Sequence, residues 1–215
     1  MFRIYTNILF LWIQLKRRNN EKFTNQINNY LIWTHLHSSL HIYQLCMGMK
    51  KFNTLVLDVT IYILDFLYRG RDFQRFWVLE VIARAPYFSF ISVLHFRESL
   101  GLRGEDHIYL MKEHFYQALN ETEHLEEMEL REGNKYWIDR FFAKHLVLVY
   151  YWIMVGYYLL DPTNAYDINM KIEKHAFETY TKYSAYHPED TKIAEIAQDE
   201  LDHSRELKKA MLMIA

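Results

Sequence analysis

The chain has few of the residues that build turns and cross-links. Its 215 residues include only 1 Cys, 3 Pro and 6 Gly. A single Cys excludes a disulfide framework and any metal site made of several cysteines. So few Gly and Pro also argue against a β-sandwich or barrel, which needs a turn about every 8–12 residues. The scarcity of turn residues therefore favours long helices.

What the chain has in excess is apolar and aromatic surface. It is 51% hydrophobic and 17% aromatic, with a formal net charge of −2. The aromatic content excludes a disordered chain, and the length is sufficient for one domain with a real core. The nearly balanced charge gives no support for nucleic acid as a partner. We therefore predict a mostly helical, all-α single domain.

From residue 50 onward, apolar residues recur at the spacings of three and four that are typical of helices. Gly101, Gly104, Gly133 and Pro162 interrupt this pattern. Six helices are expected, four of them central, over residues 51–69, 72–99, 106–131, 137–160, 166–184 and 190–212. Residues 1–49 show little helical periodicity. We treat them as an N-terminal extension of undisclosed role, followed by one functional domain at 50–215.

The longest uncharged apolar stretch runs from Leu146 to Leu160. It has 15 residues, whereas a membrane-spanning helix needs roughly 20. The stretch is therefore too short to be assigned as transmembrane. It is expected to be a buried core helix or a helix that lies in the membrane interface.

Two Glu-x-x-His pairs stand in this helical frame, Glu121 with His124 and Glu200 with His203. Residues three apart share a helix face, so both side chains of a pair reach the same place. Four-helix bundles that bind two iron or manganese ions use one such pair on each of two helices and a single Glu on each of the other two. In a chain with 11 His, roughly one pair is expected by chance, so the context must decide.

The context is a set of carboxylates on apolar helix faces. Glu80 lies within the most apolar part of the second helix, and Glu173 shares its face with Ala176 and Phe177. An ionised carboxylate among apolar residues is costly unless it is paired or binds a metal. Helix lengths also place Glu173 and Glu200 at similar heights in the last hairpin. Four helices thus each present one inward carboxylate, and two of them add a His.

Each of these residues also has an ordinary interpretation. Glu80 could pair with Arg84 one turn away, without any metal. Glu121 could belong to the acidic, solvated run that follows it, and His203 could be a surface residue. These interpretations are credible one at a time and much less so for all six residues together.

The motifs around these residues resemble the alternative oxidase family, most closely its plastid (plastoquinol) terminal oxidase branch. The resemblance covers about residues 50 to 210. It is carried by the segments 63–69 (ILDFLYR), 75–88 (RFWVLEVIARAPYF), 92–99 (SVLHFRES), 120–124 (NETEH), 139–145 (DRFFAKH), 173–180 (EKHAFETY) and 199–203 (DELDH).

The resemblance implies a ferritin-like four-helix bundle with a di-iron site and two additional interfacial amphipathic helices. It implies a membrane-bound enzyme that oxidises quinol and reduces dioxygen to water without proton pumping. By position, the iron ligands would be Glu80, Glu121, His124, Glu173, Glu200 and His203.

The resemblance assigns roles to further positions. Tyr180 matches a tyrosine beside the irons, and we interpret it as a donor of an electron and a proton when the O–O bond breaks. Asp199 and Asn120 match residues behind the ligands, and a carboxylate such as Asp199 can hold the second ring nitrogen of a ligating His. His95 and Tyr158 match positions needed in the plastid branch. The quinol pocket would be lined by Arg75, Leu79, Ala176, Thr179 and, with a weaker match, Asp58.

The implied partners are plastoquinol or ubiquinol, dioxygen, one membrane leaflet and a second copy of the chain. The membrane would be a thylakoid or plasma membrane if the source is photosynthetic. The chain differs from the family in the segment between its last two helices, since Glu173 and Glu200 are only 27 residues apart. Three alternatives remain open: another ferritin-like di-iron oxygenase, a non-catalytic iron-binding bundle, and a degraded homologue with a structural role.

Overall fold

The structure, a computed structural model, describes residues 48–214. The predicted extension at residues 1–49 lies almost wholly outside the described residues. Within the described part, six segments are helical and none is a strand. The prediction of an all-α chain is therefore confirmed.

The helices lie close to where the sequence pattern places them. The described part begins within a first helix that ends at residue 67, and its residues 49–67 are called the 49–67 helix below. The others are α2 (Asp72–Ser99), α3 (His107–Leu130), α4 (Trp137–Leu160), α5 (Pro162–Tyr186) and α6 (Thr191–Ile214). Only α5 differs clearly, because it begins four residues before the predicted start. Pro162 occupies its first turn and the Asp161 side chain accepts a hydrogen bond from the Asn164 backbone, so a turn signal in sequence is a helix cap in the structure.

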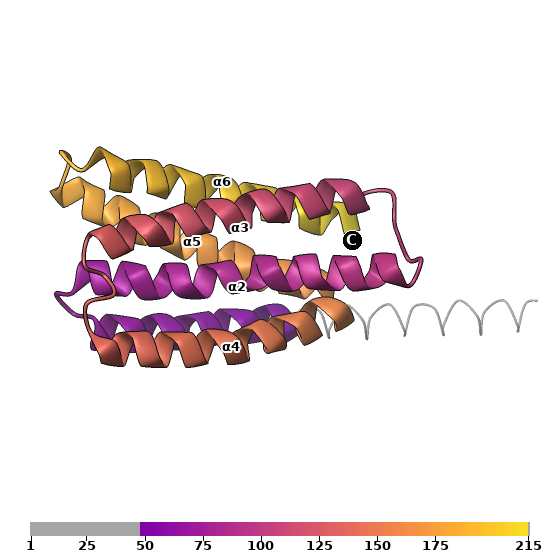
Figure 1. The fold of residues 1–215 in the computed structure, drawn as a ribbon, viewed down its shortest axis with the longest axis horizontal. Coiled ribbons are helices and arrows are strands. Elements are labelled where there is room, and N and C mark those ends of the chain that lie inside the picture. Colours follow the sequence, from indigo (N-terminus) through magenta and orange to yellow (C-terminus); the bar gives the residue numbers. More distant parts are fainter. Residues whose placement is uncertain (1–47, 215) are drawn as a thin grey trace, which may run out of the picture. The chain divides into compact units, whose positions relative to one another are not determined.

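Four of the helices form the predicted bundle. The hairpins α2–α3 and α5–α6 pack against each other, with α2 beside α5 and α3 beside α6. Helix α4 packs outside the bundle against α2 and α5, and the 49–67 helix runs alongside α4 (Figure 1). The fold is thus a four-helix bundle with two further helices on one side.

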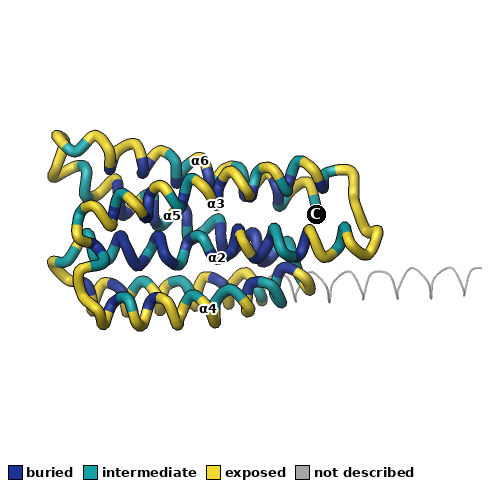
Figure 2. The backbone as a smooth tube through the Cα atoms, in the orientation of Figure 1, coloured by how far each residue is buried: buried dark blue, intermediate teal, exposed yellow. Residues whose placement is uncertain are grey.

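The core consists of two apolar clusters at different heights along the bundle. One contains Phe76, Trp77 and Met128, and the other contains Phe90 and Leu207. On each bundle helix, buried residues follow the inward face (Figure 2). On α3, α5 and α6 the predicted metal ligands lie between the two clusters in sequence, and on α2 Glu80 lies within the first cluster, so a polar layer interrupts the apolar interior.

Polar side chains attach the 49–67 helix to the rest of the fold. Asn53 is fully buried, and its Nδ2 donates to the Asn164 carbonyl and to Asp167 Oδ2, both at 3.0 Å. Its Oδ1 accepts from the Tyr157 hydroxyl at 2.9 Å. A buried amide with three partners holds this helix in one register against α4 and α5.

A second attachment lies at the other end of the same helix. The Tyr68 hydroxyl donates to Asp139 Oδ1 at 3.3 Å, and the Arg71 guanidinium pairs with the same carboxylate. Asp139 is buried near the start of α4. The two attachments therefore fix both ends of the space between the 49–67 helix and α4.

The outer surface of these two helices is apolar. Large side chains that are at least half exposed gather there: Phe52, Leu55, Val59, Tyr62, Phe66, Leu67, Trp137, Phe142, Leu146, Leu148, Val149, Trp152, Ile153 and Leu160. By length and composition, α2 and α4 are each apolar enough to cross a membrane, but α2 is mostly buried and α4 is mostly not. The whole of α4 is therefore long and apolar enough to cross a membrane, although the 15-residue uncharged stretch within it is too short by itself.

Gly133 and Gly156 offer a matched test of this packing. A Cβ atom at Gly133 would lie 2.6 Å from the Phe73 carbonyl oxygen and 2.7 Å from that of Met128, whereas at Gly156 in α4 nothing lies within 4 Å. We expect Gly133→Ala to lower the free energy of unfolding by about 1–3 kcal/mol, because backbone must move. Gly156→Ala should raise it by up to about 1 kcal/mol, because Ala is the better helix former. Urea unfolding in detergent measures both, and equal effects would contradict this packing.

Candidate metal centre

Six charged or ionisable side chains meet in the polar layer of the bundle. Glu80 comes from α2, Glu121 and His124 from α3, Glu173 from α5, and Glu200 and His203 from α6. They form two overlapping groups, in each of which the ligand atoms lie within 4.8 Å of one another. Glu80 and His124 belong to the first group, Glu173 and His203 belong to the second, and both groups share Glu121 and Glu200. The structure therefore brings together all six predicted ligands.

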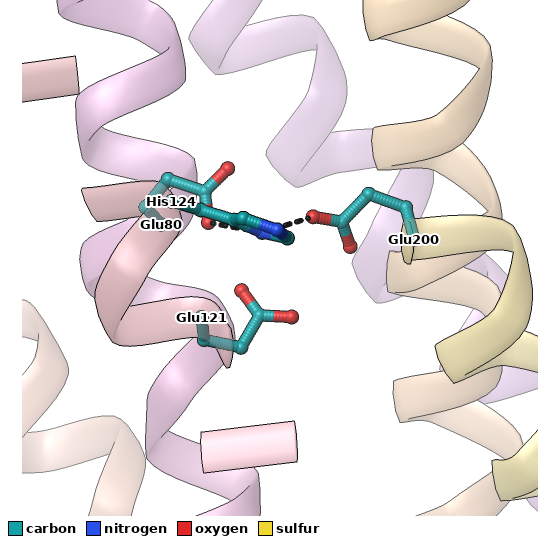
Figure 3. A group of neighbouring side chains, drawn as sticks. All are labelled: Glu80, Glu121, His124 and Glu200. Atoms are coloured by element: carbon teal, nitrogen blue, oxygen red, sulfur yellow. Dashed lines mark hydrogen bonds and ion pairs between the residues drawn. The ribbon is translucent and has the colours of Figure 1, made fainter. Parts of the chain in front are cut away.

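Figure 3 shows how the first group converges from three helices. His124 points between the carboxylates of Glu80 and Glu200, with its Nδ1 atom 3.8 Å and 3.1 Å from them. The Glu121 carboxylate approaches the same space from the next turn of α3. In the second group, His203 Nδ1 lies 2.8 Å from Glu121 Oε1. Both imidazoles thus turn Nδ1 toward the carboxylates.

These six side chains are buried, and none is more than 4% exposed. One oxygen of each of the four carboxylates, and Nε2 of His203, has no hydrogen-bond partner among the described residues. A buried carboxylate oxygen without a partner is costly, and a metal ion is the usual remedy. Carboxylates with a few imidazoles are the donor set that suits iron and manganese. The residues therefore fit a metal centre.

The interactions behind the ligands also suit metal binding. Asp199 Oδ2 lies 3.1 Å from His124 Nε2, on the side of the ring away from the carboxylates. A ligating His usually donates its second N–H to such a carboxylate, which fixes the ring. Asn120, one turn before His124 on α3, helps to lower the pKa of Asp199. Both residues lie beside His124 in the structure, and their roles stay predictions.

Burial and mutual repulsion control the ionisation of the cluster. Burial, reinforced by the charge of Glu121, raises the pKa of Glu80 and of Glu200 well above the usual value, and raises that of Glu173 to about 8. Burial is the largest effect on Glu121, but the hydrogen bond to His203 and the nearby charges of His203 and His124 together leave the Glu121 pKa lowered. Burial is also the largest effect on His203, but the same hydrogen bond and the charges of Glu121, Glu173 and Asp199 together raise its pKa. Without added positive charge, the cluster therefore binds more protons than the same groups would with their usual pKa values.

Two buried tyrosines donate hydrogen bonds to the ligands. The Tyr180 hydroxyl donates to Glu80. The Tyr87 hydroxyl donates to Glu173 Oε1 at 2.8 Å. Burial raises the pKa of both phenols well above the usual value, so both keep their protons at neutral pH. Tyr180 thus lies beside a candidate ligand, while its role stays a prediction. The sequence analysis missed Tyr87, which stands seven residues after Glu80 on the same helix face.

Two cavities lie beside the cluster. The apolar cavity, of about 190 Å³, lies between the 49–67 helix, α2, α4 and α5. Its lining includes Leu79 and Ile172, which directly precede Glu80 and Glu173. The polar cleft, of about 520 Å³, is lined in part by Arg75 and Thr179. Both cavities therefore come within one residue or one helix turn of the metal ligands.

The structure separates the residues predicted to line one quinol pocket. Leu79 faces the apolar cavity, Arg75 and Thr179 face the polar cleft, and Ala176 is part of the buried core. Asp58 is exposed and lines neither cavity. His175, which the sequence analysis missed, lines both. A signal was present, since His175 interrupts an apolar stripe made with Ile168 and Ile172.

His95 and Tyr158 lie away from the cluster. His95 is exposed near the end of α2, fifteen residues beyond Glu80. Tyr158 is buried in the second apolar cluster, where its hydroxyl bonds to that of Tyr166 at 2.7 Å. Neither side chain contacts a predicted ligand in the described structure, so a role for either in chemistry at the cluster stays a prediction.

The carboxylate pKa values predict how the metal-free protein responds to pH. Between pH 6.5 and 8, folded Glu173 keeps a proton that the unfolded chain, with a pKa near 4.5, has lost. The folded state then binds more protons, so its stability falls as pH rises, by roughly 2 kcal/mol over this range for Glu173 alone. His203, with a raised pKa, acts in the same direction.

Urea unfolding at pH 6.5, 7.2 and 8 measures this fall. Glu173→Gln should reduce the slope, because the amide does not titrate. Metal loading should abolish it, because bound cations keep the carboxylates ionised. A metal-free protein that gains stability over this range would contradict the arrangement.

Comparison with known proteins identifies the family of the chain. Over 132 residues it is 47% identical to a protein named ubiquinol oxidase 4, chloroplastic/chromoplastic, from Arabidopsis thaliana. The aligned part is 61% of this chain but 37% of the relative, so the chain spans well under half of that protein's length. No solved structure gave a significant match. A family model described as alternative oxidase matches residues 13–210, which includes most of the segment treated above as an extension. Since this match covers nearly the whole sequence, the chain belongs to the alternative oxidase family.

Proposed function

We propose that the chain is a quinol:oxygen oxidoreductase of the alternative oxidase type, with a di-iron centre that reduces dioxygen to water. The observation that carries the proposal is the buried cluster of four carboxylates and two imidazoles beside an apolar cavity. Family membership and the name of the Arabidopsis relative support the same activity.

The overlap of the two ligand groups supports a pair of metal ions. Glu80 and His124 would hold one ion, Glu173 and His203 would hold the other, and Glu121 and Glu200 would serve both. Four ionised carboxylates balance the charge of two divalent cations, which removes the repulsion that raises the carboxylate pKa values. Two iron ions bound there would supply the redox chemistry that reduces dioxygen.

The chain's own side chains hold and orient this centre. Asp199 keeps the Nε2 proton of His124, so that Nδ1 is free to ligate. Tyr180 donates to Glu80 and is placed to supply a proton and an electron as the O–O bond breaks. The surrounding apolar clusters exclude bulk water from the layer.

The apolar cavity is where we place the quinol ring. It is lined by both the 49–67 helix and α4, and its lining also includes Leu79 and Ile172, each adjacent in sequence to a predicted ligand. His175 supplies a polar group at the junction with the polar cleft, and its Nε2 lies 3.5 Å from the Arg75 guanidinium and 3.3 Å from the Thr179 hydroxyl. A largely apolar wall with few polar groups is typical of sites for apolar ligands.

The exposed apolar surface of the 49–67 helix and α4 supports binding to one membrane leaflet. So large an apolar surface is rare on a soluble monomer. The apolar cavity is lined by the same two helices, so quinol would enter from lipid. A thylakoid membrane would agree with the chloroplast named for the relative. A homodimer is expected from the resemblance alone.

Loss of a shared ligand should abolish both iron and activity. We expect Glu121→Ala, in the chain reconstituted into liposomes, to bind no iron pair and to show no quinol-dependent oxygen uptake. Glu126→Ala is the matched control, because Glu126 is exposed on the same helix. Elemental analysis and an oxygen electrode provide the measurements.

Other outcomes of this experiment would count against the proposal. Oxygen uptake retained by Glu121→Ala would show that the ligand assignment is wrong. A wild-type chain that binds fewer than two irons would contradict the proposed enzymatic activity. Two bound irons without quinol oxidation would favour another di-iron oxygenase.

The quinol position can be tested at the cavity wall. Val56 lines the apolar cavity, whereas Val59 lies on the same helix and lines neither cavity. We expect Val56→Trp to fill the cavity and raise the quinol KM roughly tenfold or more, with normal iron content. Val59→Trp should leave the KM unchanged. Equal quinol KM values for the two variants would show that quinol does not bind in this cavity.

A further inference from the structure

A chain of buried polar side chains runs through the second apolar cluster toward the metal layer. Tyr158, Tyr166 and His114 are each at most 1% exposed. The Tyr158 hydroxyl lies 2.7 Å from that of Tyr166, which lies 2.7 Å from His114 Nε2. His114 Nδ1 lies 3.0 Å from Oε1 of Gln117, which is fully buried. Only Tyr158 among them has a predicted role, from the family resemblance, and the arrangement proposed above uses none of them.

The hydrogen bonds along this series of side chains all run the same way, with each donor on the Tyr158 side and each acceptor on the Gln117 side. Burial lowers the pKa of His114 to about 4, so the imidazole is neutral and carries one N–H. The Gln117 oxygen can only accept, so Nδ1 donates to it and Nε2 accepts from Tyr166. Tyr166 in turn accepts from Tyr158. Because Oε1 of Gln117 is bound in this way, its amide nitrogen must point elsewhere.

The register of α3 and α5 shows where Gln117 lies. His114 contacts Tyr166, and seven residues further along both helices Glu121 and Glu173 share one ligand group. The two helices therefore advance together across the bundle over about 10 Å. Gln117 on α3 and Asn169 on α5 lie between these two levels, and both are fully buried. They form the layer next to the metal ligands.

The amides of this layer lack partners. Nε2 of Gln117 and both Nδ2 and Oδ1 of Asn169 have no hydrogen-bond partner among the described residues. Buried polar atoms in native proteins are nearly always paired with protein or ordered water. Two donors and one acceptor at one level of the core match the bonding of a water molecule.

We propose that Gln117 and Asn169 hold an internal water site next to the metal ligands, and that water formed from dioxygen leaves the metal layer through it. The chain from Tyr158 to His114 positions the site by fixing the Gln117 amide. This role rests on the proposed function. Each dioxygen takes four electrons and four protons to become two waters, and two quinols become two quinones. The apolar cavity offers those waters few hydrogen-bond partners, whereas the amide layer offers three buried polar atoms that have none.

A structure of the iron-loaded full chain in detergent, at a resolution that shows waters, tests the site directly. We expect an ordered water within hydrogen-bond distance of Gln117 Nε2 and of the Asn169 side chain. A dry layer, or a direct bond between the two amides, would overturn the proposal even if quinol-dependent oxygen uptake is normal. If the wild-type chain takes up no oxygen with quinol, the outlet role falls with the proposed function, while the ordered water still decides the site.

Kinetics test the outlet. Asn169→Leu keeps the side-chain size and removes the water's partners, so kcat should fall severalfold while iron content and quinol KM stay normal. Tyr166→Phe removes the hydroxyl that fixes the tautomer of His114. In this variant kcat should also fall, by a smaller factor, while iron content and quinol KM stay normal. Gln74→Leu, at a partly exposed position on α2, is the control. An unchanged kcat in Asn169→Leu, or a loss of iron, would show that the amides serve the fold alone.

Discussion

The rest of the structure depends on holding four carboxylates inside an apolar bundle. Glu80, Glu121, Glu173 and Glu200 come from four different helices and meet where one oxygen of each has no partner in the described chain. Burial and mutual repulsion oppose this arrangement, as the raised carboxylate pKa values show. It persists because apolar clusters pack above and below the layer and because bound cations would remove the repulsion. Stability and metal binding are therefore coupled in this fold.

The surroundings of the layer divide into two kinds of environment. Toward the 49–67 helix and α4 the environment is apolar, with a cavity that reaches Leu79 and Ile172 and an outer surface suited to lipid. Along the bundle axis it is polar, with Gln117, Asn169 and the chain that ends at Tyr158. An enzyme that takes an apolar substrate and makes water needs both environments at one centre.

Much of this could be predicted from the sequence, for physical reasons. Long periodic segments with few Gly and Pro gave helix bounds within a few residues, except at α5, where Asp161 and Pro162 begin a helix rather than simply ending one. The six candidate ligands, which the structure brings together, could be identified because carboxylates on apolar helix faces are too costly to be incidental. The quinol pocket was less predictable, because a cavity depends on which helices are neighbours. Asp58, on an exposed surface, and His175, between two cavities, illustrate this limit.

The sequence by itself determined the helices, the inward carboxylates and the two Glu-x-x-His pairs, since these follow from periodicity and from the cost of burying charge. Only the tertiary structure decided which residues act together. It made Glu121 and Glu200 the shared members of two ligand groups, and it set Asp199 behind His124. It also aligned Gln117 with Asn169 across the core. Such relations depend on the register between helices far apart in sequence, which packing fixes and local pattern does not encode.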